Sequence, residues 1–417
     1  MLQRSSMNII VLTSSFPRDK DDYKARWILE LGQEFVKDGL LPSILCPHVK
    51  GSKTYETIDG IEVYRFRYAP ERYESLGYGN FLPHENSSSF IGVLLQYLLN
   101  SLLMLSLLFF MFLNLHKLTK KKKAKLIFSN WAFPAGFVSA VYRQISGIPS
   151  VLKVYGTDLV FLKRFRLRPL GKYILDEHDA IIAISEYTKA CALTFDVDPE
   201  RVSVFPVGSN YPIKNCSAFQ EDFERKWCLS DRPTIFTVHR LIPLKGTSFL
   251  IKAMSKIASV HPDALLVIGG EGPERSMLES LVRSYQLEHN VLFTGLLPNE
   301  DLPLLYEACD VYVIPSITDK WGNAEGLGMP ALEAMSYGKP VVGFDSGGPG
   351  LTITDGSNGF KVPEKDWEAM ADRIILLLSD PVLRTKIGDN GRSMFDDYRW
   401  DKVSPLYTEV LYSAVKG

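Results

Sequence analysis

The sequence predicts an α/β protein made of two Rossmann-like, doubly wound domains, each with a parallel sheet covered by helices on both faces. The chain has 417 residues, which is enough for two domains. It contains 46% hydrophobic and 23% charged residues, a composition typical of a folded globular protein. Short β-branched runs alternate with helical patterns through both halves of the chain, and this alternation indicates parallel sheets.

In the first half, the expected strands are short apolar runs, and some of them are followed by a helical pattern. Residues 57–66 are expected to form a hairpin or a bent strand, because Asp59 and Gly60 supply a turn within this strand-like run. The other expected elements of this half are strands at 9–12, 43–46, 125–129, 150–155, 180–184 and 202–205, and helices at 24–37, 90–115 and 135–145.

The alternation restarts after a polar segment at 207–232, which we interpret as a linker. The expected elements that follow are strands at 234–238, 264–268, 291–293, 311–314 and 340–344, and helices at 247–259, 273–285, 299–308 and 330–337. We therefore expect an N-terminal domain at 1–206, a C-terminal domain at 207–397, and a helix at 398–417 that packs back on the N-terminal domain. Two such domains would face each other across a cleft at the carboxyl ends of their strands, where these folds bind ligands.

Charge is distributed unevenly between the two halves. Residues 1–205 carry 26 Lys and Arg against 20 Asp and Glu, whereas residues 206–417 carry 21 against 28. The basic half predicts contact with an anionic surface. Nucleic acid is not the expected partner, because no long basic stripe with interleaved aromatic residues is present. The five cysteines form no CxxC pair, so we expect neither a disulfide scaffold nor a zinc module.

An uncharged segment runs from Phe90 to Leu115, and a cluster of lysines follows between Lys117 and Lys125. Three structures fit this pattern: a helix that spans a membrane, a monotopic helix that inserts partway, and a helix buried against its own domain or a partner. A spanning helix would place strands of one expected sheet on opposite sides of the membrane. We therefore favour a membrane-associating helix at about 90–118 with its lysines on an anionic membrane surface. This predicts a cytoplasmic protein that is peripheral at the inner face of the cell membrane.

Two cations stand in the loop that follows the first strand of the second half. Arg240 offers a planar fork of donors and Lys245 a point charge, and both suit a diphosphate. A glycine-rich turn at 269–272 follows the next strand, and Gly270 there would let the backbone approach a ligand closely. Each pattern alone also fits an ordinary structure, namely a solvated loop or a tight turn.

The sharpest pattern begins at Glu325. Gly328 precedes an expected helix with Pro330 in its first turn, so the backbone N–H groups that follow Gly328, beginning with Met329, suit an anion. Glu325 lies before this helix, and Glu333 lies about one turn inside it. Two carboxylates that flank an anion site are suited to bind sugar and ribose hydroxyls. The alternative is an ordinary helix entry whose acidic residues complement the helix dipole.

These residues carry a resemblance to a known family. The second half resembles the nucleotide-sugar-binding domain of the retaining GT-B glycosyltransferases of family GT4. Glu325 and Glu333 match that family's two glutamates separated by seven residues, and Arg240 and Lys245 match its diphosphate-binding cations. The remaining matching segments are 340–342, 347–348 and 355–360 in this half and, more loosely, 130–136, 147–149, 155–158, 184–186 and 206–208 in the first half, which resembles the family's acceptor domain.

The resemblance implies an enzyme of EC class 2.4, a hexosyltransferase that moves a sugar from a UDP- or GDP-sugar with retained anomeric configuration. Arg240, Lys245 and Glu325 would be its catalytic residues, with the cations on the leaving diphosphate and Glu325 on the donor sugar. The donor-binding residues would be Gly270, Gly328, Met329, Pro330 and Glu333, the last of these on the ribose. No metal or other cofactor is implied. No protein nucleophile is needed either, because the donor phosphate helps to take the acceptor proton.

The resemblance also implies an acceptor that is a glycan or a lipid-linked molecule, in cell-surface polysaccharide or glycolipid synthesis. Arg18, Tyr155 and Asp158 are the candidates on the acceptor side. The chain departs from the family at two points here. It has no glycine pair after the first strand, and Tyr155 stands where many members have histidine.

Two alternatives remain at this point. One is a non-catalytic, glycosyltransferase-like subunit that docks a partner at the membrane. The other is a different GT-B enzyme, such as a sugar-nucleotide epimerase. Detectable hydrolysis of a nucleotide-sugar would distinguish an enzyme from a non-catalytic subunit.

Overall fold

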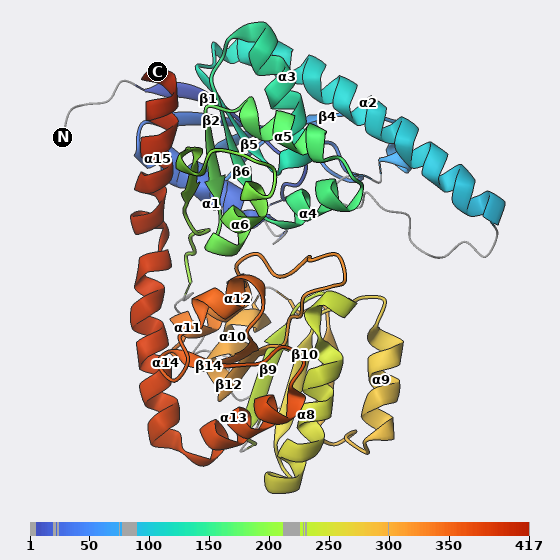
Figure 1. The fold of residues 1–417 in the computed structure, drawn as a ribbon, viewed down its shortest axis with the longest axis vertical. Coiled ribbons are helices and arrows are strands. Elements are labelled where there is room, and N and C mark those ends of the chain that lie inside the picture. Colours follow the sequence, from blue (N-terminus) through green and yellow to red (C-terminus); the bar gives the residue numbers. More distant parts are fainter. Residues whose placement is uncertain are drawn as a thin grey trace. The chain divides into compact units, whose positions relative to one another are not determined.

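The computed structural model describes residues 6–19, 22, 25–74, 76, 90–211, 226–227, 229, 232–298 and 300–416, with the backbone alone at 90–97. The chain divides into two compact units (Figure 1). The first unit comprises Met1–Ile184, Lys189–Gly208 and Trp400–Gly417, and the second comprises Ser185–Thr188 and Ser209–Arg399. The expected linker lies largely outside the described residues.

The first unit contains an eight-stranded sheet in the order β3-β4-β2-β1-β5-β6-β7-β8. Neighbouring strands are parallel except β3 and β4, which form the expected hairpin. The strands are β1 (Met7–Leu12), β2 (Leu40–Pro47), β3 (Tyr55–Ile58), β4 (Ile61–Phe66), β5 (Leu126–Asn130), β6 (Ser150–Val154), β7 (Ala180–Ala183) and β8 (Val202–Val204).

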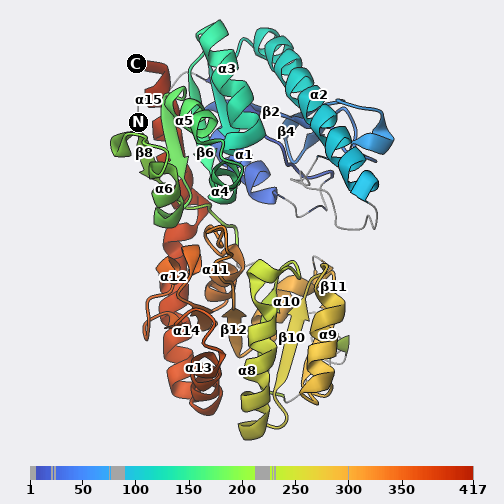
Figure 2. The same cartoon turned by 45° about the vertical axis from the view of Figure 1, so that its right-hand side comes forward.

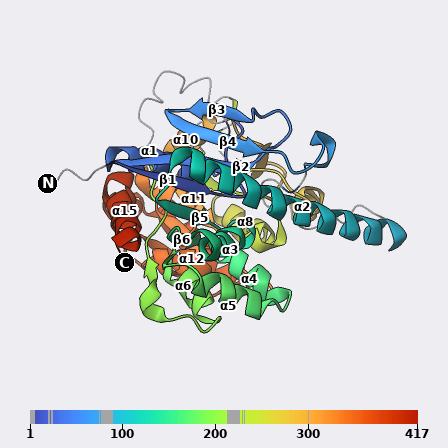
Figure 3. The same ribbon diagram turned by 90° about the horizontal axis from the view of Figure 1, so that it is seen from above.

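Helices cover both faces of this sheet. The α-helices of the first half are α1 (Arg26–Lys37), α2 (Phe90–Lys122), α3 (Phe137–Ser146), α4 (Thr157–Arg164), α5 (Arg168–Asp176) and α6 (Glu186–Leu193), and α15 (Trp400–Lys416) joins this unit from the end of the chain. On one face, α2 and α3 pack on apolar side chains of β1, β2 and β5 (Figure 3). On the other face, α1 lies beside α15, which also contacts β5 and β6 (Figure 1).

The second unit contains a parallel six-stranded sheet in the order β11-β10-β9-β12-β13-β14. The strands are β9 (Thr234–Val238), β10 (Leu265–Gly269), β11 (Val291–Gly295), β12 (Val311–Ile314), β13 (Val341–Phe344) and β14 (Gly359–Val362). The α-helices are α8 (Thr247–Val260), α9 (Arg275–Ser284), α10 (Asp301–Ala308), α11 (Met329–Ser336), α12 (Gly347–Thr352), α13 (Trp367–Ser379) and α14 (Pro381–Phe395).

The two faces of the second sheet differ in character. One face is an aliphatic core, in which side chains of the central strands pack against α8, α9 and α13; Figure 2 shows α8 and α9 beside β10. The other face carries aromatic residues, because Phe236 of β9 and Tyr312 of β12 pack against Tyr306 of α10. Both faces are therefore buried, as the near-continuous apolar strands predict.

The predicted fold class, two parallel-sheet α/β units, is confirmed. The sequence patterns did not predict β14, α12, α13 or α14 in the second half of the chain, nor α4, α5 and α6 in the first half. The helices missed in the first half are short: α4 has 8 residues and α5 has 9, so each offers only about two turns of pattern in sequence. The remaining short elements are η1 (Glu71–Tyr73), η3 (Ala132–Gly136), η4 (Pro199–Arg201), η6 (Pro243–Lys245) and η7 (Asp396–Tyr398).

Candidate functional site

The residues predicted for a donor site lie at the carboxyl edge of the second sheet. All six strands run parallel, but the order in which the chain adds them reverses between β9 and β12, so the connections after these two strands lead to opposite sides of this switch point. Arg240 and Lys245 follow β9, Gly270 follows β10, and Glu325 follows β12. The topology thus brings three separate sequence motifs to one edge.

The loop after β9 is fixed by a glycine. Gly246 has a φ of +62°, and a Cβ atom there would lie 2.0 Å from the carbonyl oxygen of Pro315. No residue with a side chain would fit so close to the end of β12, so Gly246 allows the loop after β9 to pack there. This packing places Lys245 beside the loop that follows β12. Arg240, earlier in the loop, is exposed. Among the residues that the structure describes, its guanidinium has no hydrogen-bond or ion-pair partner.

Lys245 and Glu325 form an ion pair, although 80 positions separate them in sequence. Their side chains are only 18% and 20% exposed, so water screens the pair less than it would at an open surface. The structure therefore joins two of the predicted catalytic residues directly. Burial, with the nearby Lys245 charge as the next cause, lowers the pKa of His239 to about 3, which leaves that imidazole neutral.

The glycine-rich turn after β10 has a structural cause that its sequence did not reveal. Gly270 has a φ of +118°, and a Cβ atom there would lie 2.0 Å from the carbonyl oxygen of His239. A Cβ at Gly272 would lie 2.2 Å from the carbonyl of Leu241. The missing side chains of these glycines let the turn pack directly on the backbone of the loop that carries Arg240. Their role is to position that loop, and no ligand is needed to explain them.

The start of α11 offers fewer free donors than its sequence predicts. Gly328 caps the helix with a φ of +81°, and its carbonyl accepts a bond of 2.9 Å from Ala331 N–H. Pro330 has no N–H to give. The backbone donors that remain at this turn are those of Gly328 and Met329, so an anion here would be held by two amides rather than by a full turn.

Glu333 lies in α11 and accepts a hydrogen bond of 2.7 Å from the hydroxyl of Tyr306 in α10. Burial raises the pKa of the neighbouring Tyr312 hydroxyl above its usual range, and the charges of Glu333 and Glu325 add to the rise. The charges of the two carboxylates are thus felt at this hydroxyl, although it hydrogen-bonds to the backbone of Val238 and not to a carboxylate. Sequence reasoning missed Tyr306, because no spacing rule connects it to Glu333.

The acceptor-side candidates of the first unit are engaged differently. The Tyr155 hydroxyl donates to Asn130 Oδ1 at 2.8 Å and accepts from Trp27 Nε1 at 3.2 Å. Asp158 accepts backbone bonds of 2.7 Å from Ala132 and 3.1 Å from Tyr155, and burial raises its pKa. Both side chains therefore brace the loops that follow β5 and β6.

Arg18 and Trp131 complete the polar and aromatic groups at this edge. Arg18 is half exposed and bonds to Asp22 through its backbone N–H at 3.0 Å and its Nε at 3.4 Å. Trp131 has a φ of +68°, an unusual value for a bulky residue, and stacks on Tyr155 with ring centroids 4.7 Å apart. No sequence pattern predicted this backbone conformation.

The apolar helix α2 has two distinct long faces. One face packs in the core of the first unit through Leu103, Leu107, Met111, Leu115 and Leu118. The opposite face exposes large apolar side chains, namely Leu98, Leu99, Leu102, Leu105, Phe109 and Phe110. Within the described residues, the helix at Leu98–Lys122 is long and apolar enough to cross a membrane by length and composition, but only 22% of its most apolar window is buried.

The lysines that follow are not equivalent. Lys122 forms an ion pair with Glu62 and is half buried. The exposed members of the cluster are Lys117, Lys120, Lys121, Lys123 and Lys125. The helix thus combines an internal packing face with an exposed surface that is apolar first and basic at its end.

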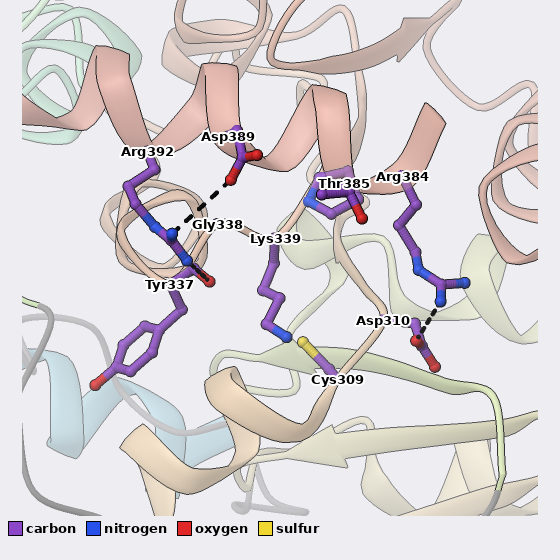
Figure 4. A pocket seen from close by; sticks show the side chains of 10 residues that line it. Cys309, Asp310, Tyr337, Gly338, Lys339, Arg384, Thr385, Asp389 and Arg392 are labelled. Carbon is purple, nitrogen blue, oxygen red and sulfur yellow. Dashed lines mark hydrogen bonds and ion pairs between the residues drawn. The ribbon is translucent and has the colours of Figure 1, made fainter. Parts of the chain in front are cut away.

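A small cavity lies at the opposite edge of the second sheet, where β12 and β13 begin (Figure 4). Its volume is about 280 Å³, and none of the predicted site residues lines it. Its charged groups largely neutralise one another, since Arg384 lies 3.3 Å from Asp310 and Arg392 lies 3.8 Å from Asp389. The cavity therefore does not compete with the carboxyl edge as the functional site.

Comparison with known proteins gives consistent matches for both units. Residues 219–394 match the family model described as glycosyl transferases group 1, and residues 25–208 match the glycosyl transferase 4-like domain. A GDP-mannose-dependent phosphatidylinositol monomannoside mannosyltransferase of Mycolicibacterium smegmatis is 35% identical over 61% of this chain and 67% of that protein. An uncharacterized glycosyltransferase of Methanocaldococcus jannaschii is 26% identical over 89% of this chain and 98% of that protein.

Solved structures match over nearly the whole chain. Sucrose-phosphate synthase from Thermosynechococcus elongatus superposes with a TM-score of 0.76 at 22% identity, covering 98% of each chain. Anabaena HepE, solved with UDP-glucose, gives a TM-score of 0.72 at 18% identity and covers 98% of this chain and all of that one. At these identities the structural matches establish the fold.

Proposed function

Because the chain belongs to the glycosyl transferases group 1 family and has the GT-B fold, we propose that it is a retaining hexosyltransferase that uses a UDP- or GDP-sugar. One observation carries the proposal. Arg240, Lys245, Glu325 and Glu333 come from two loops and a helix and gather at the carboxyl edge of one sheet, beside its switch point. This is the place and the set of groups that a sugar diphosphate requires.

In this proposal the Lys245–Glu325 pair is the resting state of the site. A donor diphosphate would attract Lys245, since two phosphate charges outweigh one carboxylate. Glu325 would then be released to accept bonds from hydroxyls of the donor sugar. Arg240 and the amides of Gly328 and Met329 would stabilise the charge that develops on the leaving diphosphate, usually the largest contribution to such catalysis.

The mechanism needs no protein nucleophile and no metal. His239 has a pKa too low for it to act as a general base at neutral pH. Front-face attack, in which the donor phosphate takes the acceptor proton, uses only the groups named above. The M. smegmatis relative is described as GDP-mannose-dependent and HepE was solved with UDP-glucose, which makes GDP- and UDP-sugars the first donors to test.

For the acceptor, the proposal is a glycan or lipid-linked molecule of cell-surface polysaccharide or glycolipid synthesis, met at the inner face of the cell membrane. The supporting feature is α2. Its exposed face carries Leu102, Leu105 and Phe109, whose side chains are 65%, 65% and 59% exposed. Such a row of large apolar side chains is unusual on a surface that contacts only water. Exposed lysines lie at the end of the same helix, and each contributes about 1 kcal/mol of binding free energy near an anionic membrane surface.

The nucleotide-sugar test is a thermal-shift screen of UDP-, GDP- and ADP-sugars, followed by a hydrolysis assay with the sugar that binds. We expect one nucleotide class to raise the melting temperature, because a ligand stabilises the state that binds it. Slow donor hydrolysis should follow and should disappear in Arg240→Ala. A protein that binds none of these sugars would be a non-catalytic subunit instead.

The membrane test is sedimentation with vesicles of phosphatidylcholine alone or mixed with phosphatidylglycerol. Wild-type protein should bind the anionic vesicles, and Lys120→Gln should weaken binding, whereas Lys122→Gln should not, because Lys122 already pairs with Glu62. Salt should weaken binding without abolishing it, since apolar insertion resists screening. Equal recovery of the protein with neutral and anionic vesicles would remove the role given to the lysines.

A further inference from the structure

Tyr306 lies under the predicted donor site and has no assigned role. It belongs to α10, is completely buried, and directs its hydroxyl to Glu333 Oε2 at 2.7 Å. Glu333 is half buried in α11, so the bond links two helices at the point where the second carboxylate of the motif emerges. A hydrogen bond to an ionised acceptor is stronger than one between neutral groups.

The Tyr306 ring is held rigidly on three sides. It stacks on Tyr337 with a centroid distance of 5.8 Å and an interplanar angle of 17°. Phe236 and Tyr312 of the sheet approach at 5.3 and 5.7 Å. A ring packed in this way has one available orientation, so the position of its hydroxyl is set by the core of the unit rather than by the site itself.

The hydroxyl can only donate to this carboxylate at neutral pH. Burial, with the Glu333 charge as the next cause, raises the Tyr306 pKa well above its usual value. The phenol therefore keeps its proton at neutral pH. Glu333 has several rotatable bonds, and a fixed donor on Oε2 restricts the conformations that its carboxylate can adopt.

We propose that Tyr306 is a positioning residue that orients Glu333 for the ribose hydroxyls of the donor nucleotide. The inference rests on the proposed function, in which Glu333 contacts the ribose. It goes further by assigning part of the nucleotide affinity to a residue that touches only another protein side chain. A preorganised acceptor loses less conformational freedom when the ligand arrives.

The test is a double-mutant cycle on nucleotide binding. GDP and UDP are titrated calorimetrically into wild type, Tyr306→Phe, Glu333→Ala and the double variant. We expect Tyr306→Phe to weaken binding of the preferred nucleotide about tenfold, as loss of one charge-assisted bond implies. The double variant should bind as Glu333→Ala does, because Tyr306 has no carboxylate left to orient. The sugar-transfer step should show a raised KM with little change in kcat.

Tyr312→Phe is the matched control. It removes a buried hydroxyl from the same aromatic cluster, but one that contacts the backbone of Val238 rather than a carboxylate. It should leave nucleotide affinity within about twofold. Melting temperatures of both phenylalanine variants report on packing separately from affinity.

The outcomes separate this inference from the proposed function. If Glu333→Ala weakens binding and Tyr306→Phe does not, the positioning role is wrong while the donor site stands. If the two single effects add in the double variant, Tyr306 acts independently of Glu333 and the inference fails. If wild type binds neither nucleotide, or Glu333→Ala binds normally, the proposed role of Glu333 fails and the inference fails with it.

Discussion

The carboxyl edges of the two sheets use their polar residues in opposite ways. In the second unit, the edge presents an exposed Arg240 and a partly exposed Lys245–Glu325 pair. In the first unit, the equivalent edge encloses Tyr155 and Asp158, and their polar atoms bond to neighbouring loops. A charged ligand would thus find ready partners at the second edge, whereas the first edge offers an ordered aromatic surface. We expect substitutions at the second edge to affect activity and those at the first edge to affect stability.

The largest expected effect is on activity at the second edge. Arg240→Ala should slow sugar transfer by a factor of about 10²–10³, equivalent to about 2–4 kcal/mol in the barrier, because a cation on the leaving diphosphate is lost. Its melting temperature should stay close to that of wild type, since the side chain is exposed and has no partner among the described residues. Steady-state kinetics with the donor found in the screen measure this. Wild-type turnover in the folded variant would contradict the assignment of Arg240.

The next effect is a pH dependence of stability that originates beneath the first edge. Lys153 of β6 is completely buried, its Nζ has no hydrogen-bond partner among the described groups, and burial lowers its pKa to about 7. Between pH 7 and its usual pKa, the unfolded chain binds a proton that the folded chain does not. Stability should therefore rise with pH, by about 1.4 kcal/mol per unit and about 2–3 kcal/mol from pH 7 to 9.

Lys153→Met tests this dependence, with the exposed Lys163→Met as the matched control. Urea unfolding at pH 7, 8 and 9 should show the rise in wild type and in the control, and a flatter profile in Lys153→Met. The range stops at pH 9, because burial also raises the pKa values of Cys46 and Cys309 to about 12 and their titration opposes the trend above that point. Equal slopes in the three proteins would show that the Lys153 ammonium is not desolvated in the native state.

A smaller effect is expected at Asp158. Replacing it with alanine removes the acceptor for the backbone N–H groups of Ala132 and Tyr155 and leaves those donors buried. The cost should be about 1–3 kcal/mol of unfolding free energy. Denaturant midpoints measure the loss, and donor hydrolysis in the remaining folded protein should be close to wild type. Loss of hydrolysis without loss of stability would place Asp158 in the chemistry and weaken the contrast between the two edges.

The smallest expected effect is that of chelation. Sugar transfer should be unchanged in excess EDTA, because Arg240, Lys245 and the amides of Gly328 and Met329 are proposed to supply the positive charge. The assay compares rates with and without EDTA and after addition of Mg²⁺ or Mn²⁺. Activity that disappears with EDTA and returns with either ion would assign part of that charge to a metal.

The sequence predicted the fold class, and the grouping of Arg240, Lys245 and Glu325 at one edge of the second sheet follows from that fold for a physical reason. Parallel strands bury both faces, so each appears as a short apolar run, and chain direction then dictates which loops share an edge. The pairing of Lys245 with Glu325 follows from that topology. The sequence did not predict that Gly270 allows the turn after β10 to pack against the backbone at His239. A glycine in a sequence does not show which group lies close to it in the fold.

Side-chain partners across the fold were the least predictable feature. Tyr306 reaches Glu333 only because α10 and α11 lie on the same face of the sheet, and no periodicity encodes that contact. The burial of Asp158 and Lys153 likewise depends on what covers them. The two-sided character of α2 was ambiguous for a related reason: a helix that is apolar all round does not show in sequence which side meets its own core.

The return of α15 to the first unit has a consequence for biosynthesis. Trp400 is buried against Gly208, and its Nε1 donates a hydrogen bond of 2.8 Å to Glu30 Oε2. The hydroxyl of Tyr407 donates a bond of 2.8 Å to the carbonyl of Pro206, and the Tyr407 ring packs against the Nζ of Lys153. A ribosome makes these residues only after the whole of Ser209–Arg399. Until α15 is synthesised, part of one face of the first unit's sheet therefore stays uncovered, whereas the second unit can already complete its sheet. A fragment that stops at Gly208 would leave that face open to solvent, so we expect it to aggregate where the second unit, expressed alone, stays in solution.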